Sequence, residues 1–501
     1  RPPSALSPAG RSRAVTCLAP SFSTELAHRL AAGAPLPAAD LAELFRLAEP
    51  PTPEADTLRH GLQAHLLART LEHARTNTAF YRRDPAYHHW RPQGTGGAPF
   101  LDGLPAIDRA QVVAHHGEIL ATDVTLRSIC HTSGTTGTPL DVYKSFEECR
   151  FIADYFNAMF EPLRRMLPSL PLSLSFPNNY HGVPLPMPGL GMGFVGGVTD
   201  DTLILDARRL IDTPYALPGH DSRIRFLSGL GHHVLLFTSW LQECGVDPAS
   251  YGFGAVSVTG GYMAPQWMGF LRESWKCPVN NRFTLTETVG GASRLYDRDR
   301  FVVDPFLIME ALAPDDDTAI ASGIGRLAIT NLHPFVQMQP LIRYLTGDLV
   351  RWITPPLGRP QFDFLGKQKN CLRDPFAAAP SWLVFSAVLN DILSDIPDIN
   401  VYDWFSNVRV VHDRSVGSLP LIAVSSQTDE DGGLTIVLDI ELRYAPATRR
   451  ARLAEIERTI VERLRATPDT TLAIRLDEGR VRLRIDYKAP GQLRSPIVIK
   501  I

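Results

Sequence analysis

A loop rich in glycine and hydroxyl side chains occupies residues 131–140, with the sequence His-Thr-Ser-Gly-Thr-Thr-Gly-Thr-Pro-Leu. Such a loop can bring backbone N–H groups and hydroxyls close to phosphate oxygens, because glycine has no Cβ that would keep a ligand away. Residues 145–148, Ser-Phe-Glu-Glu, form a capping-box pattern, which predicts that a helix begins just after the loop. We therefore predict a phosphate-binding loop, with an exposed linker as the alternative.

The loop is not a P-loop of the Walker type. That motif requires a lysine directly after its second glycine. The residues from Gly134 onwards, Gly-Thr-Thr-Gly-Thr-Pro-Leu, have no lysine at that place. The sequence also lacks a kinase-type set of catalytic Asp and Asn residues, so it argues against an unrelated NTPase or kinase.

Three further polar stretches follow the loop at long intervals. They are Phe-Thr-Leu-Thr-Glu at 283–287, Ile-Arg-Tyr-Leu-Thr-Gly-Asp-Leu at 342–349 and Gly-Lys-Gln-Lys-Asn at 366–370. Together with residues 132–139, these stretches resemble, in order and rough spacing, the signature segments of the adenylate-forming enzymes. That superfamily includes acyl-CoA synthetases, the adenylation domains of peptide synthetases, and luciferases. Each stretch alone is common, whereas four in the family's order are specific.

Two regions narrow the resemblance to one branch of the superfamily. Three stretches are similar to sequences of the phenylacetate–CoA ligase branch: residues 71–82, residues 104–109, and Pro-Leu-Ile-Arg-Tyr at 340–344. Members of that branch activate mainly aryl and arylacetic acids. The resemblance covers residues of about 65 to 390 well and the last hundred only loosely.

The resemblance implies roles for named residues. The loop would bind the phosphates of ATP, Phe283 would stack on adenine, and Asp348 would bind the ribose hydroxyls. The implied nucleotide-binding residues are Thr132, Ser133, Gly134, Thr135, Thr136, Gly137, Gly260, Gly261, Phe283, Thr284, Asp348 and Lys367. Glu287 is implied as the ligand of Mg²⁺, a role that suits a hard oxygen donor, and we group Thr286 with it as catalytic.

The chain departs from the family pattern at its lysines. A lysine near the C-terminus bridges the acid and the phosphate in the family, and only Lys488 and Lys500 are available here. Lys488 is our candidate catalytic lysine, with a plain surface lysine as the alternative, because the family's surrounding motif is absent. Lys367 replaces the usual hinge arginine and would contact phosphate or ribose, and Lys369 is the candidate hinge residue.

The acid pocket is the least determined part of the site. Phe176, Asn179, Tyr180 and Phe194 fall where the family builds this pocket. The aromatic rings could enclose an aromatic acid, and the amide could bond a ring substituent, which suggests a hydroxy- or aminobenzoate. Core packing is the alternative for the aromatic residues. The strand end that lies against adenine in the family is Thr-Gly-Gly-Tyr at 259–262, and we expect Tyr262 to fill the space of a missing acidic residue.

The elements that must position these residues follow an α/β pattern. Residues 57–76 read as a helix, and residues 172–176, 234–238 and 255–260 read as short strands, which predicts a largely parallel sheet. We expect a large N-terminal α/β domain of several subdomains over residues 57–365, preceded by a loosely packed Ala/Pro-rich lead-in at 1–56.

The pattern changes after residue 365. Residues 407–411, 419–425 and 434–442 read as strands, 446–466 as a helix, and a hairpin turn is expected at 477–479. Residues 366–501 are therefore predicted to be a small, mobile α+β domain.

Composition limits the compartment and the partners. The net charge of −3 is spread along the chain and gives no argument for nucleic acid or an anionic membrane as partner. Six cysteines lack any Cys-x-x-Cys pair, which excludes a disulfide framework and a sequence-local zinc site and favours the cytoplasm. No apolar run approaches the roughly 20 residues needed to span a bilayer. A homodimer is compatible with the sequence.

The expected function is ATP- and Mg²⁺-dependent conversion of a carboxylic acid to an acyl adenylate, followed by transfer to CoA. Two alternatives stay open. The acceptor could instead be a carrier protein, an amine or another small nucleophile. The protein could also be a nucleotide-binding scaffold without catalysis, since the lysine motif and the acidic residue beside adenine are altered.

Overall fold

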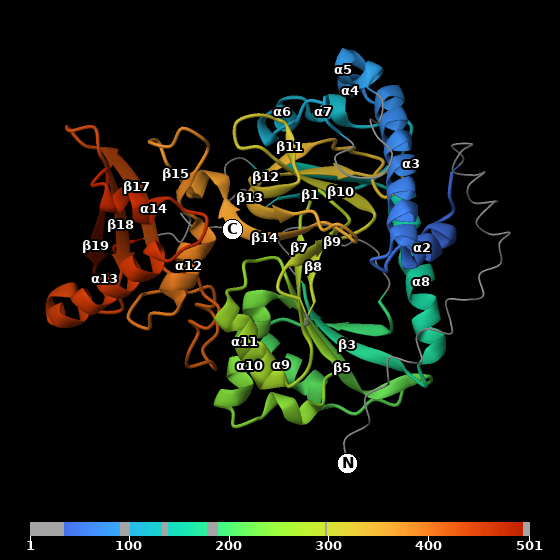
Figure 1. Ribbon diagram of the computed structural model, residues 1–501. Helices are drawn as coiled ribbons and strands as arrows, with labels where there is room; N and C mark the ends of the chain where they lie inside the picture. Colours follow the sequence, from blue (N-terminus) through green and yellow to red (C-terminus); the bar gives the residue numbers. More distant parts are fainter. Residues whose placement is uncertain (1–34, 91–100, 133–138, 178–188, 296–297, 494–501) are drawn as a thin grey trace.

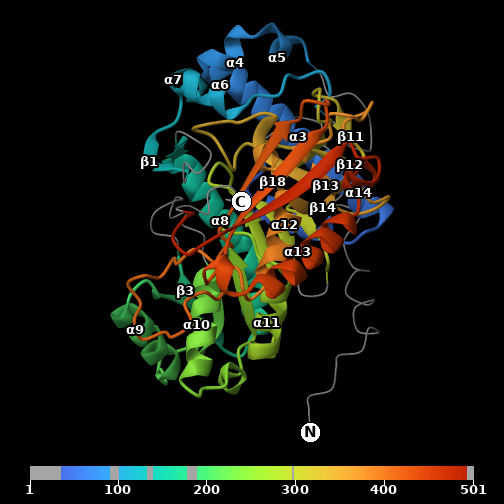
Figure 2. The ribbon, with the colours of Figure 1, turned by 90° about the vertical axis from the view of Figure 1, so that its left-hand side faces the viewer.

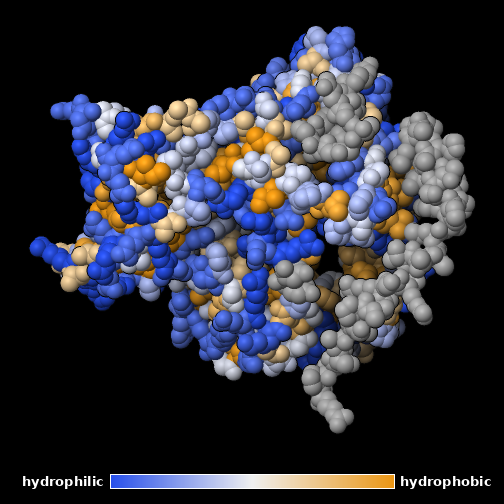
Figure 3. Space-filling view, in the orientation of Figure 1, coloured by the Kyte–Doolittle hydropathy of each residue, from blue (hydrophilic) through white to orange (hydrophobic). Residues whose placement is uncertain are grey.

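The computed structural model of the chain describes residues 35–90, 101–132, 139–177, 189–295 and 298–493. It has two domains, a large one on the right of Figure 1 and a small one, coloured orange and red, on the left. In the view of Figure 3 the visible surface of both domains is mostly hydrophilic, with apolar residues in small groups. None of the described helices combines the length and apolar character needed to cross a membrane.

Twelve of the described strands form one sheet in the large domain, in the order β11-β10-β12-β13-β14-β9-β8-β7-β6-β5-β3-β4. Its parallel half consists of β3 (Leu170–Phe176), β4 (Met192–Val195), β5 (His220–Leu230), β6 (Ala255–Thr259) and β7 (Val279–Thr284). Its antiparallel half consists of β8 (Gly291–Arg294), β9 (Phe301–Val303), β10 (Leu307–Leu312), β11 (Ala319–Ile320), β12 (Ser322–Asn331), β13 (Tyr344–Ile353) and β14 (Gln361–Lys367). The α/β class is confirmed, but the expectation of a largely parallel sheet holds only as far as β7.

Each half of the sheet has its own apolar core. The parallel half packs against α9 (Asp201–Asp212), α10 (Gly231–Glu243) and α11 (Pro265–Trp275). The antiparallel half packs against α2 (Ala38–Leu47), α3 (Pro53–Asn77) and α8 (Phe146–Met166). The strand predicted at 234–238 is wrong, because these residues lie within α10; a short apolar run does not distinguish a buried helix from a strand.

The region expected to be a loose lead-in contains a buried helix. Leu41, Leu44 and Phe45 of α2 belong to the core of the antiparallel half, and the ring of Phe45 lies edge-on to Tyr155 of α8 at 6.4 Å between centroids. The described part of residues 1–56 is therefore packed into the large domain rather than loosely attached to it.

The loop of residues 131–140 lies between two short strands, and short helices precede it in the chain. The loop connects β1 (Leu126–His131) and β2 (Asp141–Ser145), which form an antiparallel pair. The other short helices are α4 (Ala79–Arg83), α5 (Pro85–His89), α6 (Arg109–Ala114) and α7 (His116–Ile119). Ser145 caps α8 by accepting a hydrogen bond from the N–H of Glu148 at 3.0 Å, as the capping-box pattern predicts, but the Glu148 carboxylate accepts from the N–H groups of Gln337 and Met338 rather than from the N-cap backbone.

The small domain packs three helices onto a short sheet. Among its described residues, β17 (Ile422–Thr428), β18 (Leu434–Glu441) and β19 (Val481–Lys488) form that sheet, beside α12 (Ser386–Ser394), α13 (Arg450–Arg465) and α14 (Leu472–Asp477). A further pair, β15 (Leu372–Arg373) and β16 (Trp382–Val384), begins the domain. Ile456, Ile460 and Leu464 of α13 lie in its core, as their spacing predicts.

Two expectations for the small domain are wrong. The hairpin at 477–479 does not form, because α14 ends there and β19 runs parallel to β18. Gly479 has a φ of 68°, the left-handed conformation that commonly follows a helix end and that equally suits a hairpin turn. Residues 407–411 form no strand and instead leave the small domain to pack on the large one.

Candidate nucleotide site

Four of the predicted site residues converge beside the end of β7. Asp348 of β13 is the register partner of Lys367 of β14, and Asp348 Oδ1 lies 2.6 Å from Lys367 Nζ. Glu287 follows β7. The charge of Lys367 lowers the pKa of the Glu287 carboxyl, and the charge of Asp348 raises it. Thr132, at the start of the glycine-rich loop, joins this group through Arg109. The fold thus gathers residues of four sequence motifs separated by up to 235 positions in the numbering, from Thr132 to Lys367.

The carboxylate of Asp348 is fully buried but incompletely satisfied. Its Oδ1 contacts Lys367, and its Oδ2 receives no hydrogen bond from any residue in the described part of the chain. Gly347, just before it, has a φ of 76°, which lets the chain turn the carboxylate inward. A buried acceptor left without a donor costs about 1–3 kcal/mol, so this oxygen is one that a ligand hydroxyl could stabilise.

Glu287 is a buried carboxylate among opposing charges. The hydroxyl of Tyr344 donates to Glu287 Oε1 at 3.3 Å, and the Asn331 amide donates to the backbone carbonyl of Glu287 at 3.1 Å. Burial raises the pKa of Glu287, while the positive charges of Lys367 and Arg109 lower it. The side chain is therefore held in place and surrounded by the cations that an anionic ligand would use.

The residues fit a magnesium ion bound through a single protein carboxylate. Among the described residues, no group of three or more His, Cys, Asp and Glu side chains is arranged to hold a metal. Mg²⁺ in nucleotide sites commonly takes one or two carboxylates and completes its shell with phosphate oxygens and water. Glu287 supplies an oxygen donor of that kind.

Arg109 is a site residue that sequence reasoning did not assign. It begins α6, which is capped by reciprocal hydrogen bonds between Asp108 and Gln111. The Arg109 guanidinium donates to Thr132 Oγ1 at 3.0 Å, and the same hydroxyl accepts from the N–H of Leu140 at 3.0 Å. Its only signal in the sequence is its place in the 104–109 stretch that resembles the family.

A short strand bridge fixes Arg109 beside the Tyr-Leu-Thr-Gly-Asp segment. The N–H of Ile107 donates to the carbonyl of Arg343 at 3.1 Å, and the N–H of Leu345 donates to the carbonyl of Ile107 at 2.8 Å. These bonds flank Tyr344, whose hydroxyl contacts Glu287. The cation is thus placed by backbone pairing rather than by a flexible loop.

The turn after β6 leaves open space where adenine is expected. Gly260 has a φ of 70°, and a Cβ there would lie 2.4 Å from the Leu230 side chain, whereas a Cβ on Gly261 would meet no atom within 4 Å. The Thr259 hydroxyl lies 2.9 Å from the Thr284 hydroxyl on β7. Tyr262 does not fill the space as expected, because its hydroxyl donates to Asp391 of α12 at 2.7 Å.

The side chains that follow along β7 differ in exposure. The ring of Phe283 is partly buried and packs on Phe362 and Phe364, with centroid distances of 5.3 and 6.1 Å. Thr284 is exposed and Thr286 is partly buried. Phe283 is therefore held by an aromatic cluster while part of the residue stays exposed, which suits a ring that stacks on a ligand.

The predicted acid pocket is not supported by its aromatic members. Phe176 is fully buried and its ring packs on Phe237 at 5.2 Å, so it is a core residue rather than a pocket wall. Phe194 on β4 packs on Tyr215 at 4.7 Å. Asn179 and Tyr180 lie outside the described residues, as do Ser133, Gly134, Thr135, Thr136 and Gly137 of the loop.

The lysines of the small domain and linker lie apart from the carboxylates of the site. Lys488 ends β19, and its Nζ lies 2.9 Å from Asp439 Oδ1 on the neighbouring strand. The structure does not bring Lys488 to Glu287 or Asp348. Lys369 is exposed in the single turn Gln368–Asn370. Gly366, just before this linker, has a φ of 122°, and a Cβ there would lie 1.9 Å from Ser386 Oγ, so the linker leaves the sheet at a position that only glycine fits.

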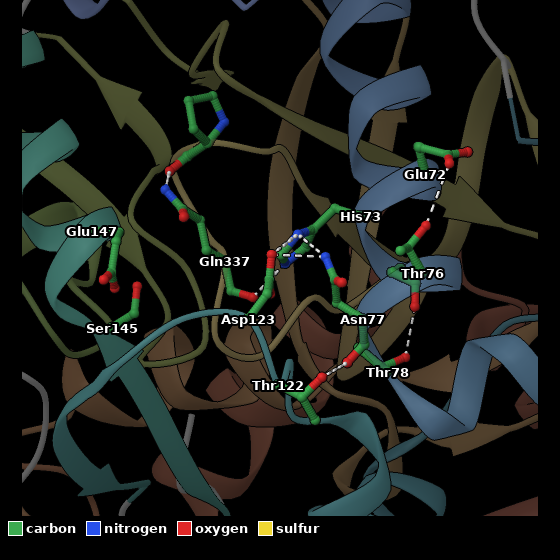
Figure 4. Close-up of polar contacts among 12 residues, drawn as sticks. Glu72, His73, Thr76, Asn77, Thr78, Thr122, Asp123, Ser145, Glu147 and Gln337 are labelled. Atoms are coloured by element: carbon green, nitrogen blue, oxygen red, sulfur yellow. Dashed lines mark hydrogen bonds and ion pairs between the residues drawn. The ribbon is translucent and has the colours of Figure 1, made fainter.

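A polar cluster around His73 has a structural role (Figure 4). His73 Nε2 contacts the carbonyl of Gln337 at 2.8 Å, and the Asn77 amide lies 3.0 Å from His73 Nδ1. Asn77 also donates to Asp123 at 2.8 Å. Because the ring donates from Nε2 and accepts at Nδ1, both nitrogens are satisfied. The cluster ties the end of α3 to the segment that leads into β13, and it is not a catalytic base.

Comparison with known proteins places the fold. No protein-family model matches the sequence, and no curated protein matches it. The 2-hydroxyisobutyryl-CoA ligase in an open conformation, in complex with 2-HIB-AMP and CoA, aligns with a TM-score of 0.61 at 13% identity, over 89% of this chain and 90% of that one. The same ligase in the thioesterification state aligns with a TM-score of 0.53 at 14% identity, over 90% of each chain. An anthranilate–CoA ligase aligns over 75% of this chain and 66% of its own at 13% identity, with a TM-score of 0.45, too low to bear on the acid. The chain has the fold of the adenylate-forming ligases, a large α/β domain followed by a small C-terminal domain.

Proposed function

We propose that the protein is an ATP-dependent ligase that converts a carboxylic acid to an acyl adenylate and passes the acyl group to the thiol of CoA. The observation that carries the proposal is the pair of buried Asp348 and partly buried Lys367 beside Glu287, in which the second carboxylate oxygen has no donor among the described residues. The structurally similar 2-hydroxyisobutyryl-CoA ligase binds an acyl adenylate and CoA, which supports this reaction class.

The first half-reaction needs positive charge around the α-phosphate. The acid's carboxylate oxygen forms a bond to the α-phosphorus, and the bond to the β-phosphate oxygen breaks, releasing pyrophosphate. Lys367 and Arg109 lie where cationic side chains can stabilise the charge that builds in this step. When bound to Glu287, Mg²⁺ would supply further positive charge to the phosphates. In the second half-reaction the thiol sulfur bonds to the acyl carbon, AMP leaves, and the thiol proton passes to solvent.

The nucleotide would lie across the turn after β6 and the ends of β7 and β13. The open space at Gly261 would admit adenine against the partly exposed Phe283, and the Asp348 carboxylate would accept hydrogen bonds from the ribose hydroxyls. The acid is proposed to be an aryl or arylacetic acid, hydroxy- or amino-substituted, on the sequence resemblance alone. The cytoplasm is the proposed compartment, and the small domain, residues 366–501, is the proposed lid.

One observation favours a second candidate, a nucleotide-binding protein that does not catalyse. Lys488, the proposed mobile cation, is paired with Asp439 within its own sheet. If this pair holds throughout, adenylation would lack the lysine that the family uses.

Pyrophosphate release with ATP and Mg²⁺, measured over a panel of aryl, arylacetic and aliphatic acids, tests the proposal. Wild type is compared with Lys488→Ala and with Arg484→Ala, a matched change on the same strand, and ATP binding is measured separately by calorimetry. Release that depends on one acid class and falls about a hundredfold in Lys488→Ala alone supports the ligase with Lys488 as its cation. ATP binding without release for any acid favours the scaffold, and neither binding nor release refutes both.

Addition of CoA tests the acceptor. A product thioester that forms at the rate of pyrophosphate release identifies CoA. Adenylate that accumulates with CoA present, and is consumed only by a carrier protein or an amine, would replace CoA with that acceptor.

A further inference from the structure

A segment of the small domain leaves that domain and docks on the large one. Its base is closed by the bridge between Val401 and Pro420 and by a hydrogen bond from the N–H of Tyr402 to the carbonyl of Leu419 at 2.9 Å. Residues 402–419, which we name the clasp, reach the helices of the parallel half. In Figures 1 and 2 this orange segment runs from the small domain to the green helices α9 and α10.

Apolar side chains of the clasp are part of the large domain's core. Phe405, Val408 and Val411 are 2%, 0% and 3% exposed and belong to the core of the parallel half. The ring of Trp404 stacks on His232 at the start of α10, with 5.5 Å between centroids. Burial lowers the pKa of His232 to about 3, so the stacked ring is neutral. The clasp is thus held by the same kind of burial that holds the helices themselves.

Two carboxylates of the large domain bind the clasp backbone. Asp201, in the first turn of α9, accepts hydrogen bonds from the N–H groups of residues 409 and 410 at 2.6 and 3.0 Å. Glu243, the last residue of α10, accepts from the N–H groups of residues 412 and 413, both at 2.8 Å. These backbone bonds lower the pKa of Asp201. A clasp that left the large domain would give up four charge-assisted hydrogen bonds as well as its buried side chains.

The other described contacts between the domains are an apolar cluster beside the linker, in which Leu365 of β14 packs with Trp382 and Phe385 of the small domain, and individual polar contacts. Tyr262 bonds Asp391, Arg351 contacts Asp469 at 2.7 Å, and Arg373 contacts Asp315 at 2.8 Å. Partly exposed ion pairs of this kind are weak and exchange readily with water. The clasp differs from the polar contacts because it is built into an apolar core, and it differs from the cluster at Leu365 because it lies far from the linker in the chain.

We propose that the clasp is a permanent second attachment of the small domain, which stays docked when the rest of that domain reorients. The small domain would then pivot about two places, the linker at 368–371 and the base of the clasp at Val401 and Pro420. Two pivots leave only rotation about the line that joins them. The permanent attachment follows from the contacts above; its part in catalysis rests on the proposed function.

A disulfide between the clasp and α10 tests whether the clasp must leave. A Cβ placed on Gly417 would lie 3.2 Å from Leu235 Cβ, close to the roughly 3.5–4.5 Å separation in disulfides. The variant Leu235→Cys/Gly417→Cys is made in a Cys244→Ser background, since Cys244 is an exposed thiol. Each single variant, and the reduced double variant, control for the loss of packing at Leu235 and for the positive φ of Gly417.

We expect pyrophosphate release and thioester formation by the oxidised double variant to stay within about twofold of the reduced form. The proposal is overturned if adenylate still forms after oxidation but thioester formation falls tenfold or more and returns on reduction. That result would mean that the clasp detaches between the two half-reactions.

Hydrogen exchange tests the attachment without any activity. The amides of residues 409–413 should be protected in wild type with and without ATP, and should exchange at least tenfold faster in Asp201→Ala/Glu243→Ala. Asp206→Ala is the matched control, because Asp206 lies on α9 and pairs with Arg209 rather than with the clasp. Unprotected amides in wild type, or no change in the double variant, would refute the clasp even if the protein proves to be a ligase. Conversely, protected amides in a protein that forms no adenylate would leave the clasp standing and refute the proposed function.

Discussion

Two lysine–carboxylate pairs in this protein each have a fully buried carboxylate, and these carboxylates differ in their hydrogen-bond donors. Lys144 and Glu148, at the start of α8, lie 3.4 Å apart and are 1% and 0% exposed. Glu148 Oε2 also accepts hydrogen bonds from the N–H groups of Gln337 and Met338 at 3.0 and 2.8 Å. In the second pair, Lys367 and Asp348, one oxygen of the carboxylate contacts the ammonium, and the other has no donor among the described residues.

The difference separates a structural charge from one that can bind a ligand. Burying a carboxylate is costly unless donors compensate it. Glu148 has donors from the protein itself, and they join α8 to the segment before β13. Asp348 retains an acceptor oxygen without a donor among the described residues, at the place where four sequence motifs meet. We therefore expect substitutions in the first pair to change stability and substitutions in the second to change ligand binding.

The largest effect should come from Glu148→Ala. Removing Glu148 leaves the buried charge of Lys144 uncompensated and leaves the N–H groups of Gln337 and Met338 without their acceptor. We therefore expect a loss of about 3–5 kcal/mol in the free energy of unfolding. Chemical denaturation measures it. Glu147→Ala, on the exposed side of the same turn, should cost much less. If Glu148→Ala loses no more unfolding free energy than Glu147→Ala does, the Lys144–Glu148 pair is not a structural charge pair.

Asp348→Asn should weaken ATP binding about a hundredfold, which corresponds to about 2.7 kcal/mol. The amide removes the negative charge and replaces one acceptor oxygen with a donor, while the fold loses no backbone hydrogen bond. The free energy of unfolding should therefore change by less than about 1 kcal/mol, because Lys367 remains partly solvated. Calorimetric titration with ATP and denaturation of the same variant measure the two quantities. If Asp348→Asn is destabilised but binds ATP with unchanged affinity, the Asp348–Lys367 pair is structural, like the Lys144–Glu148 pair.

Arg109→Ala should lower the rate of adenylation about 10- to 100-fold. Arg109 lowers the pKa of Glu287, so its removal should also move the acidic limb of the pH–rate profile to higher pH. Arg109→Lys should restore the position of that limb more fully than the rate, since it keeps the charge but not the guanidinium geometry. Arg127→Ala, on the exposed strand β1, is the control. A rate loss without movement of the limb would indicate a purely structural role.

The smallest effect concerns the bond between Tyr262 and Asp391. Burial raises the pKa of Asp391 to about 7, against the opposing influence of Tyr262 and Arg294, with Asp395 adding to the rise. When α12 is undocked, this carboxyl would ionise near pH 4. In the docked state Asp391 stays protonated up to a higher pH than in the undocked state. Docking should therefore weaken as pH rises from about 4 to about 7 and stay constant above that.

Between pH 6 and pH 8 we expect the docking of α12 to weaken about tenfold. Hydrogen exchange of the α12 amides measures this change. In Asp391→Asn the dependence should disappear, and in Tyr262→Phe it should remain while docking weakens overall. A pH dependence that survives Asp391→Asn would assign it to another group.

Local signals in the sequence predicted several elements correctly. Ser145 marks the start of α8, the apolar spacing at 57–76 marks α3, and the stripe of Ile456, Ile460 and Leu464 marks α13. Each of these signals lies within one element, so neighbours in the chain suffice to specify it. The order of the four motifs also predicted the adenylate-forming fold.

Expectations failed where a residue's partner is distant in the chain. The sequence pattern predicts strands at 234–238 and 407–411, yet the first lies in a helix and the second in the clasp. The pattern predicts a pocket position for Phe176, but the core of the parallel half encloses this residue. Burial and hydrophobicity look alike in sequence whether an element packs on its own domain or on another.

The sequence by itself determined the fold class, the motifs that meet beside β7 and the few lysines available for chemistry. Only the tertiary structure decided which buried charges have donors, that Arg109 stands beside Thr132, and that residues 402–419 belong to the core of the other domain. The physical reason is that hydrogen-bond satisfaction and burial depend on what surrounds an atom in space. Those surroundings come from segments up to three hundred positions away, as the pairing of Asp56 with the N–H of Gly358 shows.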